Sequence, residues 1–298
     1  FHAQPVACPN CGPKITFHSS RSRKSEGENA LQQAREYLRN GKIIAVKGLG
    51  GYHIACDASN ESSVATLITK KHRSQKPLAL MAFDLDYIRK YCLVSPEEEQ
   101  LLSSIQHPIV LLQKKPGISL PDQIAINQKT LGFMLPYTPL HLLLLEPEVD
   151  FPEVLVMTSG NLADEPIAYK DDDAIERLSP IVDGFLVHNR EINIRVDDSV
   201  LRVFENSSYF VRRSRGFAPE PIRINENLPD ILACGAELKN TFSLSKNKYV
   251  FISHHIGDLE NYETLQSFEN GINHYQKLFR VSPQIIAADL HPDYLSTK

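Results

Sequence analysis

The chain has 298 residues, of which 42% are hydrophobic and 23% are charged. This length predicts about two domains, and this composition is typical of a folded protein rather than a disordered one. The formal net charge of -4 argues against a protein covered by nucleic acid. The longest apolar stretch, around Leu142–Leu145, is far shorter than the roughly 18 residues of a membrane span. We therefore expect a cytoplasmic protein with no membrane partner.

Residues 1–28 are polar and carry a CxxC pair, Cys8 and Cys11, within CPNCGP. This spacing is typical of a zinc site, but structural zinc takes four ligands, so the pair supplies only half of one. His2 and His18 are possible completing ligands without the usual spacing, and a second CxxC upstream is the favoured source. We interpret residues 1–28 as the remnant of a zinc-finger module with its linker, and expect Zn²⁺ in the full-length protein.

Helices and strands alternate along residues 29–218. Apolar residues at helical spacing predict the helices, and short apolar runs predict the strands. Ser95 and Glu98 form a capping box that opens one helix. Because the late strands are close enough to pair antiparallel, we expect a twisted, mixed α/β sheet. The predicted helices are 29–38, 61–72, one beginning at 95, 138–145 and 171–178, and the predicted strands are 42–47, 77–83, 108–113, 153–158, 185–187, 200–204 and 209–212.

The order of predicted helices and strands changes after residue 218. Residues 219–230 are rich in proline and predict a linker. Beyond them we expect strands at 231–235, 241–245 and 249–253, a helix at 261–280 and a strand at 284–289. This βββαβ order is typical of the opening of a ribonuclease-H-like or actin-like fold. Residues 231–298 are therefore predicted to be the N-terminal part of a second, incomplete domain.

A basic cluster lies at the end of the predicted helix 61–72. Lys70, Lys71, Arg73 and Lys76 fall within seven residues. Alone, such a cluster is typical of a solvated helix end, where cations suit the helix dipole. Its interpretation depends on what faces it in the fold.

Small polar residues follow the apolar strand 153–158. Thr158, Ser159, Gly160 and Asn161 lie at its carboxyl end, the edge at which α/β sheets tend to bind ligands. Hydroxyl and amide groups suit phosphate and ribose oxygens. A cationic cluster facing this loop would bind a triphosphate and balance the charge that develops at a transferring phosphorus.

Three further segments carry candidate residues. Lys47 precedes the glycine-rich GLGGYH, otherwise a tight turn. Arg195 begins RVDDS, which fits a pocket, a Mg²⁺ site or a charged turn. Arg213 lies in RRSRG, which fits a charged edge strand or a cap over phosphates. No Walker motif and no GxGxxG at a helix start occur in the sequence.

Motifs along the whole chain carry a family resemblance. KHRSQKPL at 71–78 and TSGN at 158–161 resemble those of the YrdC-like family. AVKGLGGYHIACDA, MLPYTPLHLLL, RVDDSV and RRSRGFAPEPI resemble the HypF family of carbamoyltransferases of NiFe-hydrogenase maturation. VACPNCGP is similar to the end of that family's second zinc finger, and GAELKNTFSL, SHHIGDLEN and DLHPDYLST to the opening of its carbamoyltransfer domain.

The resemblance implies an adenylating enzyme. A YrdC-like domain at 29–218 would use ATP, Mg²⁺ and carbamate derived from carbamoyl phosphate to make carbamoyl-adenylate, releasing pyrophosphate. In the full-length protein the carbamoyl group would pass to the C-terminal cysteine of the partner protein HypE. Lys71 and Arg73 would contact the triphosphate, and Lys47 the carbamoyl end, as the catalytic residues. The residues implied to bind the nucleotide are Lys76, Thr158, Ser159, Asn161, Arg195 and Arg213.

Other functions are open on the same motifs. Relative to the family pattern, an acylphosphatase-like domain and the rest of the carbamoyltransfer domain are missing, so this chain is expected to adenylate but not to load HypE. Threonylcarbamoyl-adenylate synthase of tRNA modification shares the motifs, although CPNCGP before the domain and GAELKNTF after it argue against that branch. A double-stranded RNA-binding module is the third reading, which the acidic net charge disfavours.

Overall fold

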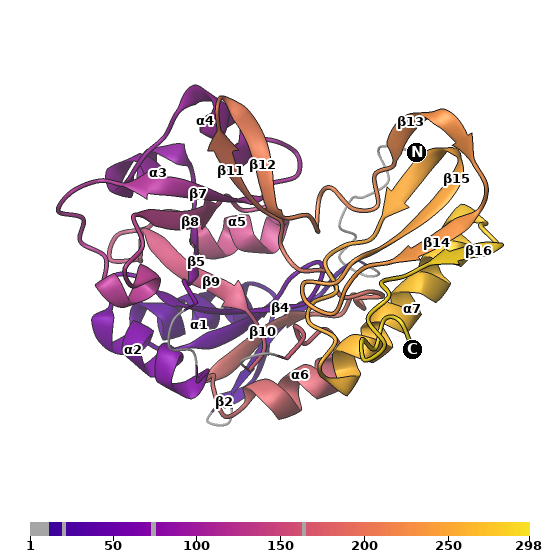
Figure 1. The fold of residues 1–298 in the computed structure, drawn as a ribbon. Coiled ribbons are helices and arrows are strands. Elements are labelled where there is room, and N and C mark those ends of the chain that lie inside the picture. The colour runs from indigo at the N-terminus through magenta and orange to yellow at the C-terminus, as the bar shows by residue number, and fades with distance from the viewer. Residues whose placement is uncertain (1–11, 20–21, 73–75, 163–164) are drawn as a thin grey trace. The chain divides into compact units, whose positions relative to one another are not determined.

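The computed structural model describes residues 12–19, 22–72, 76–162 and 165–298 (Figure 1). The described residues form a larger unit within 1–163, 167–195 and 201–209, and a smaller unit within 164–166, 196–200 and 210–298. Within the described part of the chain, no helix is long and apolar enough to cross a membrane.

A mixed sheet forms the centre of the larger unit, as the alternating pattern predicts. Its strand order is β12-β11-β7-β8-β5-β9-β4-β3-β10-β1-β2, with β6 paired to β7. Strand β3 pairs in parallel with β10 and antiparallel with β4, which pairs antiparallel with β9. The strands are β1 (Ile15–Ser19), β2 (Ser22–Glu26), β3 (Ile44–Lys47), β4 (Tyr52–Asp57), β5 (Ala79–Ala82), β6 (Cys92–Leu93), β7 (Ile109–Lys114), β8 (Thr130–Met134), β9 (Val154–Ser159), β10 (Gly184–His188), β11 (Val200–Phe204) and β12 (Ser207–Arg212).

Helices cover this sheet. Helices α2 and α6 bury Val64, Leu67, Ala174 and Leu178 in the apolar cluster that also contains Tyr52 of β4. They thereby lie on the sheet face toward which the Tyr52 side chain points. The helices of this unit are α1 (Glu28–Arg39), α2 (Glu61–Lys70), α3 (Leu85–Tyr91), α4 (Pro96–Leu102), the 3₁₀ turn η1 (Asp122–Ala125), α5 (Pro139–Leu145) and α6 (Asp171–Leu178).

Some local predictions are confirmed and some elements were missed. The capping box of Ser95 and Glu98 opens α4, with both of its hydrogen bonds present. The glycine-rich GLGGYH was expected to be a turn after the strand 42–47, yet strand β4 begins within this segment, at Tyr52. The residues of β4 are buried on both faces of the sheet, so no polar–apolar alternation marked this strand in the sequence. Helix α3 has only seven residues, too few for a clear periodic signal.

Two segments in which the sequence predicted no strand contain one in the described residues. Within the expected remnant 1–28, β1 pairs antiparallel with β10, and its Phe17 is fully buried. Within the expected linker 219–230, β13 (Ile222–Leu228) pairs with β15 (Phe242–Ile252). Residues of β13 are mostly exposed, so their polar composition resembled that of a linker.

The smaller unit has the predicted βββαβ order, but with different strands. Its sheet order is β13-β15-β14-β16, where β14 spans Ile231–Cys234 and β16 spans Ile285–Ala287. The two strands predicted at 241–245 and 249–253 are the single strand β15, and β13 completes the set. Helix α7 (Tyr262–Phe279) packs Phe268 and Tyr275 against Phe242 of β15.

Candidate nucleotide-binding site

The basic helix end and the small polar loop meet in the larger unit. Lys71 caps the C-terminus of α2, and its side chain is only 1% exposed. Its ammonium donates to the carbonyl oxygen of Ser159 and, at 3.3 Å, to Oδ1 of Asn161. The hydroxyl of Ser159 donates to the same Oδ1 at 2.7 Å. The Lys71 ammonium is thus held at the carboxyl end of β9, where the sequence analysis predicted a phosphate-binding site.

Gly160 gives this loop its shape. Its amide donates to the carbonyl oxygen of Tyr52 at 2.6 Å, and its carbonyl accepts from the amide of Ala168 at 2.8 Å. A Cβ atom at position 160 would lie 2.6 Å from the Tyr52 oxygen, closer than real Cβ contacts. Only glycine lets the backbone approach β4 this closely.

Lys47 lies in a second charged cluster on the same unit. It ends β3, is 1% exposed, and donates to His188 O at 3.1 Å and Asp171 Oδ2 at 2.9 Å, with Asp171 Oδ1 at 2.6 Å. The hydroxyl of Tyr52 donates to Asp171 Oδ1 at 2.6 Å. An ammonium has three donor hydrogens, and three protein oxygens surround this one. That Lys47 contacts a carbamoyl group stays a prediction.

The protonation states in this cluster follow from its contacts. Burial favours the neutral acid of Asp171, but hydrogen bonds from Lys47 and Tyr52 outweigh burial and lower its pKa. Burial, followed by the hydrogen bond to Asp171, raises the pKa of Tyr52. Burial and the charge of Lys47 lower the pKa of His188. At neutral pH these pKa shifts favour a carboxylate at Asp171, a neutral phenol at Tyr52 and a neutral imidazole at His188.

The other predicted residues differ in burial, and three of them lie outside the described residues. Arg73, Cys8 and Cys11 lie outside the described residues. Thr158 is buried in β9, Arg195 is buried in the larger unit, and Lys76 is exposed. No group of three or more His, Cys, Asp or Glu side chains able to hold a metal occurs among the residues that the structure describes.

Arg213 belongs to the smaller unit. Its guanidinium donates to three backbone carbonyls, those of Ile252 at 3.1 Å, Phe217 at 2.7 Å and Glu220 at 2.8 Å. Burial lowers its pKa. Within RVDDS, Asp198 forms an ion pair with Arg215 at 2.7 Å, which accords with the charged-turn reading of that motif. The phosphate-binding role of Arg213 stays a prediction.

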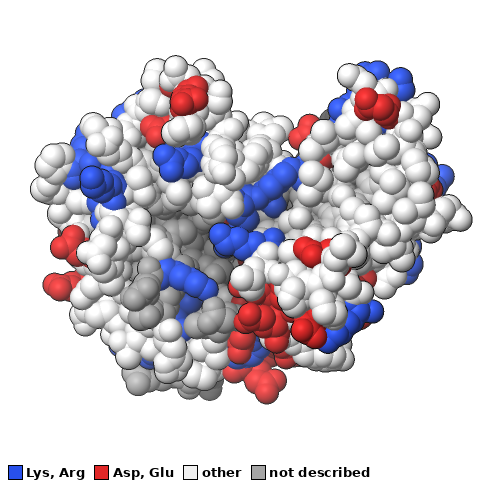
Figure 2. All heavy atoms as spheres, in the orientation of Figure 1, with Lys and Arg blue, Asp and Glu red and all other residues white. Residues whose placement is uncertain are grey.

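The sequence did not single out three residues of the charged cluster, which are Tyr52, Asp171 and His188. Asp171 lies in the predicted helix 171–178 and Tyr52 in the glycine-rich GLGGYH, and neither position carried a signal for an ion pair. On the face shown in Figure 2, acidic side chains gather where α6 lies in Figure 1. Only the fold reveals that one of these acids turns toward Lys47.

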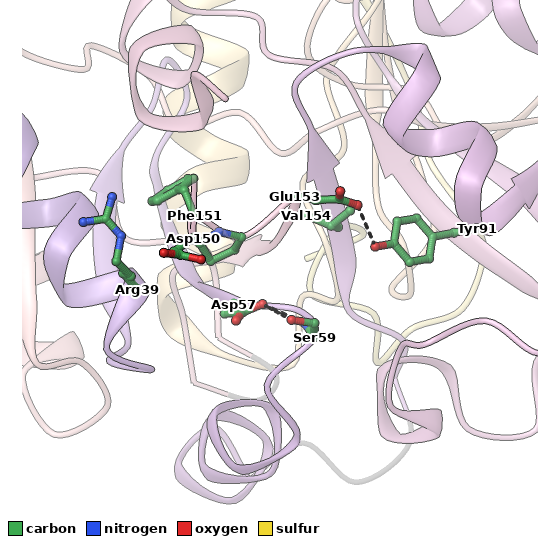
Figure 3. Close-up of a pocket in the computed structure, with 9 residues that line it drawn as sticks. Arg39, Asp57, Ser59, Tyr91, Asp150, Phe151, Glu153 and Val154 are labelled. Carbon is green, nitrogen blue, oxygen red and sulfur yellow. Dashed lines mark hydrogen bonds between the residues drawn. The ribbon is translucent and has the colours of Figure 1, made fainter. Parts of the chain in front are cut away.

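A polar cavity of about 310 Å³ lies elsewhere in the larger unit (Figure 3). None of the predicted site residues lines it. It mixes one arginine with three carboxylates, of which Glu153 accepts from Tyr91, and this charge balance suits a triphosphate poorly. Its lining residues are Arg39, Asp57, Ser59, Tyr91, Asp150, Phe151, Pro152, Glu153 and Val154.

Three family models match the chain in succession. The Sua5/YciO/YrdC model, described as telomere recombination, matches residues 36–214. The HypF Kae1-like domain model matches 226–298, and the HypF finger model matches 1–18. The order of these matches is the one that the motifs predicted.

Curated relatives extend the likeness over the whole chain. It is 45% identical to carbamoyltransferase HypF of Synechocystis, over 91% of this chain and 35% of the relative. It is 42% identical to carbamoyltransferase HypF of Rhodobacter capsulatus, over 100% of this chain and 39% of the relative. The chain thus spans little more than a third of these relatives. A threonylcarbamoyl-AMP synthase of Methylococcus capsulatus is 30% identical over 45% of this chain and 71% of that relative.

Solved structures show the same relationship. A full-length HypF in a phosphate- and nucleotide-bound form has a TM-score of 0.93 and 46% identity, covering 100% of this chain and 38% of that one. HypF of T. kodakarensis has a TM-score of 0.94 and 42% identity, over 100% and 39%. Sua5 of P. abyssi, at 15% identity and a TM-score of 0.57 over 91% and 92%, shares the fold. The chain is similar along its whole length to part of the HypF carbamoyltransferases, and it belongs to the Sua5/YciO/YrdC family.

Proposed function

We propose that the larger unit forms carbamoyl-adenylate from carbamate and ATP and releases pyrophosphate. The observation that carries the proposal is the buried ammonium of Lys71 held against Ser159 and Asn161 at the carboxyl end of β9. A similar chain, 46% identical, is known in a nucleotide-bound form, which supports ATP as the ligand.

The reaction needs positioning and charge balance rather than a nucleophilic side chain. A carbamate oxygen attacks the α-phosphorus, the bond from that phosphorus to the bridging oxygen breaks, and pyrophosphate leaves with the electron pair. Lys71, with Arg73 as its proposed companion, balances the negative charge of the leaving group. A low-dielectric surround strengthens that interaction, and Lys71 is almost fully buried.

Mg²⁺ would enter with ATP, because this ion is usually bound mainly through substrate phosphates and water. The carbonyl of Ser159 and the amide oxygen of Asn161 already accept from the Lys71 ammonium, so they hold that cation rather than the metal. The ion would shield the phosphate charge. Ser159 and Asn161 would orient the nucleotide beside Lys71, while Thr158, Lys76, Arg195 and Arg213 remain proposed nucleotide contacts.

The remaining steps are proposed for the complete protein. Carbamate would derive from carbamoyl phosphate, and the Kae1-like part that begins at 226 would pass the carbamoyl group to the C-terminal cysteine of HypE. The finger match over 1–18 supports a zinc site that includes Cys8 and Cys11.

Pyrophosphate exchange into ATP tests the proposal. The chain is given ATP, Mg²⁺ and ammonium carbamate, and exchange is compared with reactions that contain threonine and bicarbonate instead. We expect carbamate-dependent exchange that the substitution Lys71→Met lowers by about 100-fold. Lys90→Met, an exposed lysine of α3, is the matched control and keeps activity. Exchange that requires threonine would establish the synthase branch instead.

The RNA-binding reading makes a different prediction. It requires affinity for double-stranded RNA that falls steeply with salt, without turnover of ATP. The formal net charge of -4 disfavours this alternative.

A further inference from the structure

Asp171 joins the two halves of the charged cluster in the larger unit. Its Oδ1 accepts from the Tyr52 hydroxyl at 2.6 Å and lies 2.6 Å from the Lys47 ammonium, and its Oδ2 accepts from that ammonium at 2.9 Å. Lys47 is 1% exposed, whereas the Asp171 side chain is 47% exposed. A half-exposed carboxylate thus balances a buried cation and anchors a buried phenol.

The backbone of Tyr52 leads from this cluster to the nucleotide loop. Its amide donates to the Ala168 carbonyl at 2.8 Å, the Ala168 amide to the Gly160 carbonyl at 2.8 Å, and the Gly160 amide to the Tyr52 carbonyl at 2.6 Å. The three residues close a ring of hydrogen bonds. Gly160 lies between Ser159 and Asn161, the two residues that accept from Lys71. The position of Tyr52 therefore sets the position of the Lys71 acceptors.

We propose that Asp171 is a positioning residue for adenylation, acting through Tyr52 and Lys47 on the Ser159–Asn161 loop. The inference rests on the proposed function for its kinetic consequence, but not for its structural one. Asp171 does not need to touch ATP. It fixes the Tyr52 ring, and the backbone ring of Tyr52, Ala168 and Gly160 transmits that constraint to the loop.

The neighbouring acids of α6 provide matched controls. Asp171, Asp172 and Asp173 all lie in the first turn, so each favours the helix dipole to a similar extent. Asp173 pairs with Arg177 at 3.0 Å, whereas Asp171 faces Lys47 and Tyr52. A role in helix stability alone predicts equal effects of Asp171→Asn and Asp172→Asn.

Two substitutions test the positioning role in carbamate-dependent pyrophosphate exchange. Asp171→Asn is expected to lower kcat by about tenfold or more, because small displacements of reacting groups are costly. Tyr52→Phe removes one hydroxyl while the Lys47–Asp171 ion pair remains, and it is expected to lower kcat by about fivefold. The KM for ATP changes by less than about twofold in both, because Lys71 keeps its charge. Asp172→Asn leaves both constants unchanged.

Hydrogen exchange provides a readout that does not depend on activity. Amide exchange at Gly160 and Ala168 is expected to accelerate in Tyr52→Phe and Asp171→Asn, and to match the wild type in Asp172→Asn. If Asp171→Asn fails to fold because Lys47 is left without a counter-charge, Lys47→Met/Asp171→Leu removes both charges together and restores the fold. Accelerated exchange at Gly160 is expected in this pair too.

The outcomes separate the two proposals. Wild-type kcat together with wild-type amide exchange in Tyr52→Phe would overturn the positioning role of Asp171. Accelerated exchange in a wild-type chain that shows no carbamate-dependent activity would keep the positioning role and reject the proposed function. A fall in kcat without any change in Gly160 exchange would also reject the route through Tyr52.

Discussion

The Lys71 ammonium lies 3.3 Å from Oδ1 of Asn161, although 90 residues separate the two along the chain. The contact joins the C-terminus of α2 to the loop after β9 and buries the cation almost completely. A buried ammonium is costly unless oxygen atoms compensate it, so the loop and the lysine stabilise each other. The consequences of this arrangement can be measured.

Gly160→Ala is expected to damage both stability and activity. The added Cβ would meet the Tyr52 carbonyl at 2.6 Å, and backbone atoms cannot move aside as a side chain can. We expect a loss of about 1–3 kcal/mol in the free energy of unfolding, as for overpacked sites, and at least a tenfold loss of pyrophosphate exchange. In the control Gly132→Ala, the new Cβ meets a side-chain methyl of Ile109 at 3.0 Å, and activity should persist. Equal activity losses in the two variants would contradict the role of Gly160.

His188 is expected to make stability depend on pH. Its pKa in the folded protein is lowered by burial and by the charge of Lys47, so the unfolded chain binds more protons near and below pH 6.5. Stability should therefore fall as the pH drops below about 6.5, the ordinary value for histidine. Melting temperatures between pH 5 and 8 measure this slope, and His188→Gln should flatten it. An unchanged slope in that variant would assign the pH dependence to other groups.

Asp171 is expected to contribute at lower pH. Because its folded pKa lies below the ordinary value, its ionised form stabilises the fold above that value, and the contribution is lost as the pH falls through the folded pKa. Acid unfolding below about pH 4 should therefore be less steep in Lys47→Met/Asp171→Leu than in the wild type. The midpoint of acid unfolding, followed by circular dichroism, provides the comparison. Identical acid transitions would show that the ion pair adds no pH dependence.

Phe17→Ala tests whether β1 belongs to the larger unit. Phe17 is fully buried between β10 and α1, in contact with Tyr37 and under Gly184. Truncation of a buried phenylalanine is expected to cost about 3–5 kcal/mol in the free energy of unfolding. Phe204→Ala, at a half-exposed position of β11, should cost much less. Denaturant unfolding of both variants measures the difference, and a neutral Phe17→Ala would contradict the placement of β1 in the larger unit.

Sequence patterns determined those parts of the fold whose signals are local. Capping residues, helical periodicity and short apolar runs predicted α1, α2, α4, α5 and α7, because each signal lies within the element that it marks. They failed for β1, which lies between β10 and β2, for β13, whose mostly exposed residues form a sheet edge, and for β4, which is buried on both faces. In those strands the burial that defines the pattern depends on neighbours far away in the chain.

The candidate site likewise has features that the sequence predicted and features that only the tertiary structure revealed. The sequence by itself determined the family and the candidate residues Lys71, Ser159 and Asn161, because the motifs are contiguous. Only the tertiary structure decided which acid of α6 faces Lys47, and that Tyr52 links Asp171 to Gly160. The physical reason is that hydrogen bonds and ion pairs act over about 3 Å in space, and pairing of β3, β4 and β9 brings together residues that lie more than a hundred positions apart.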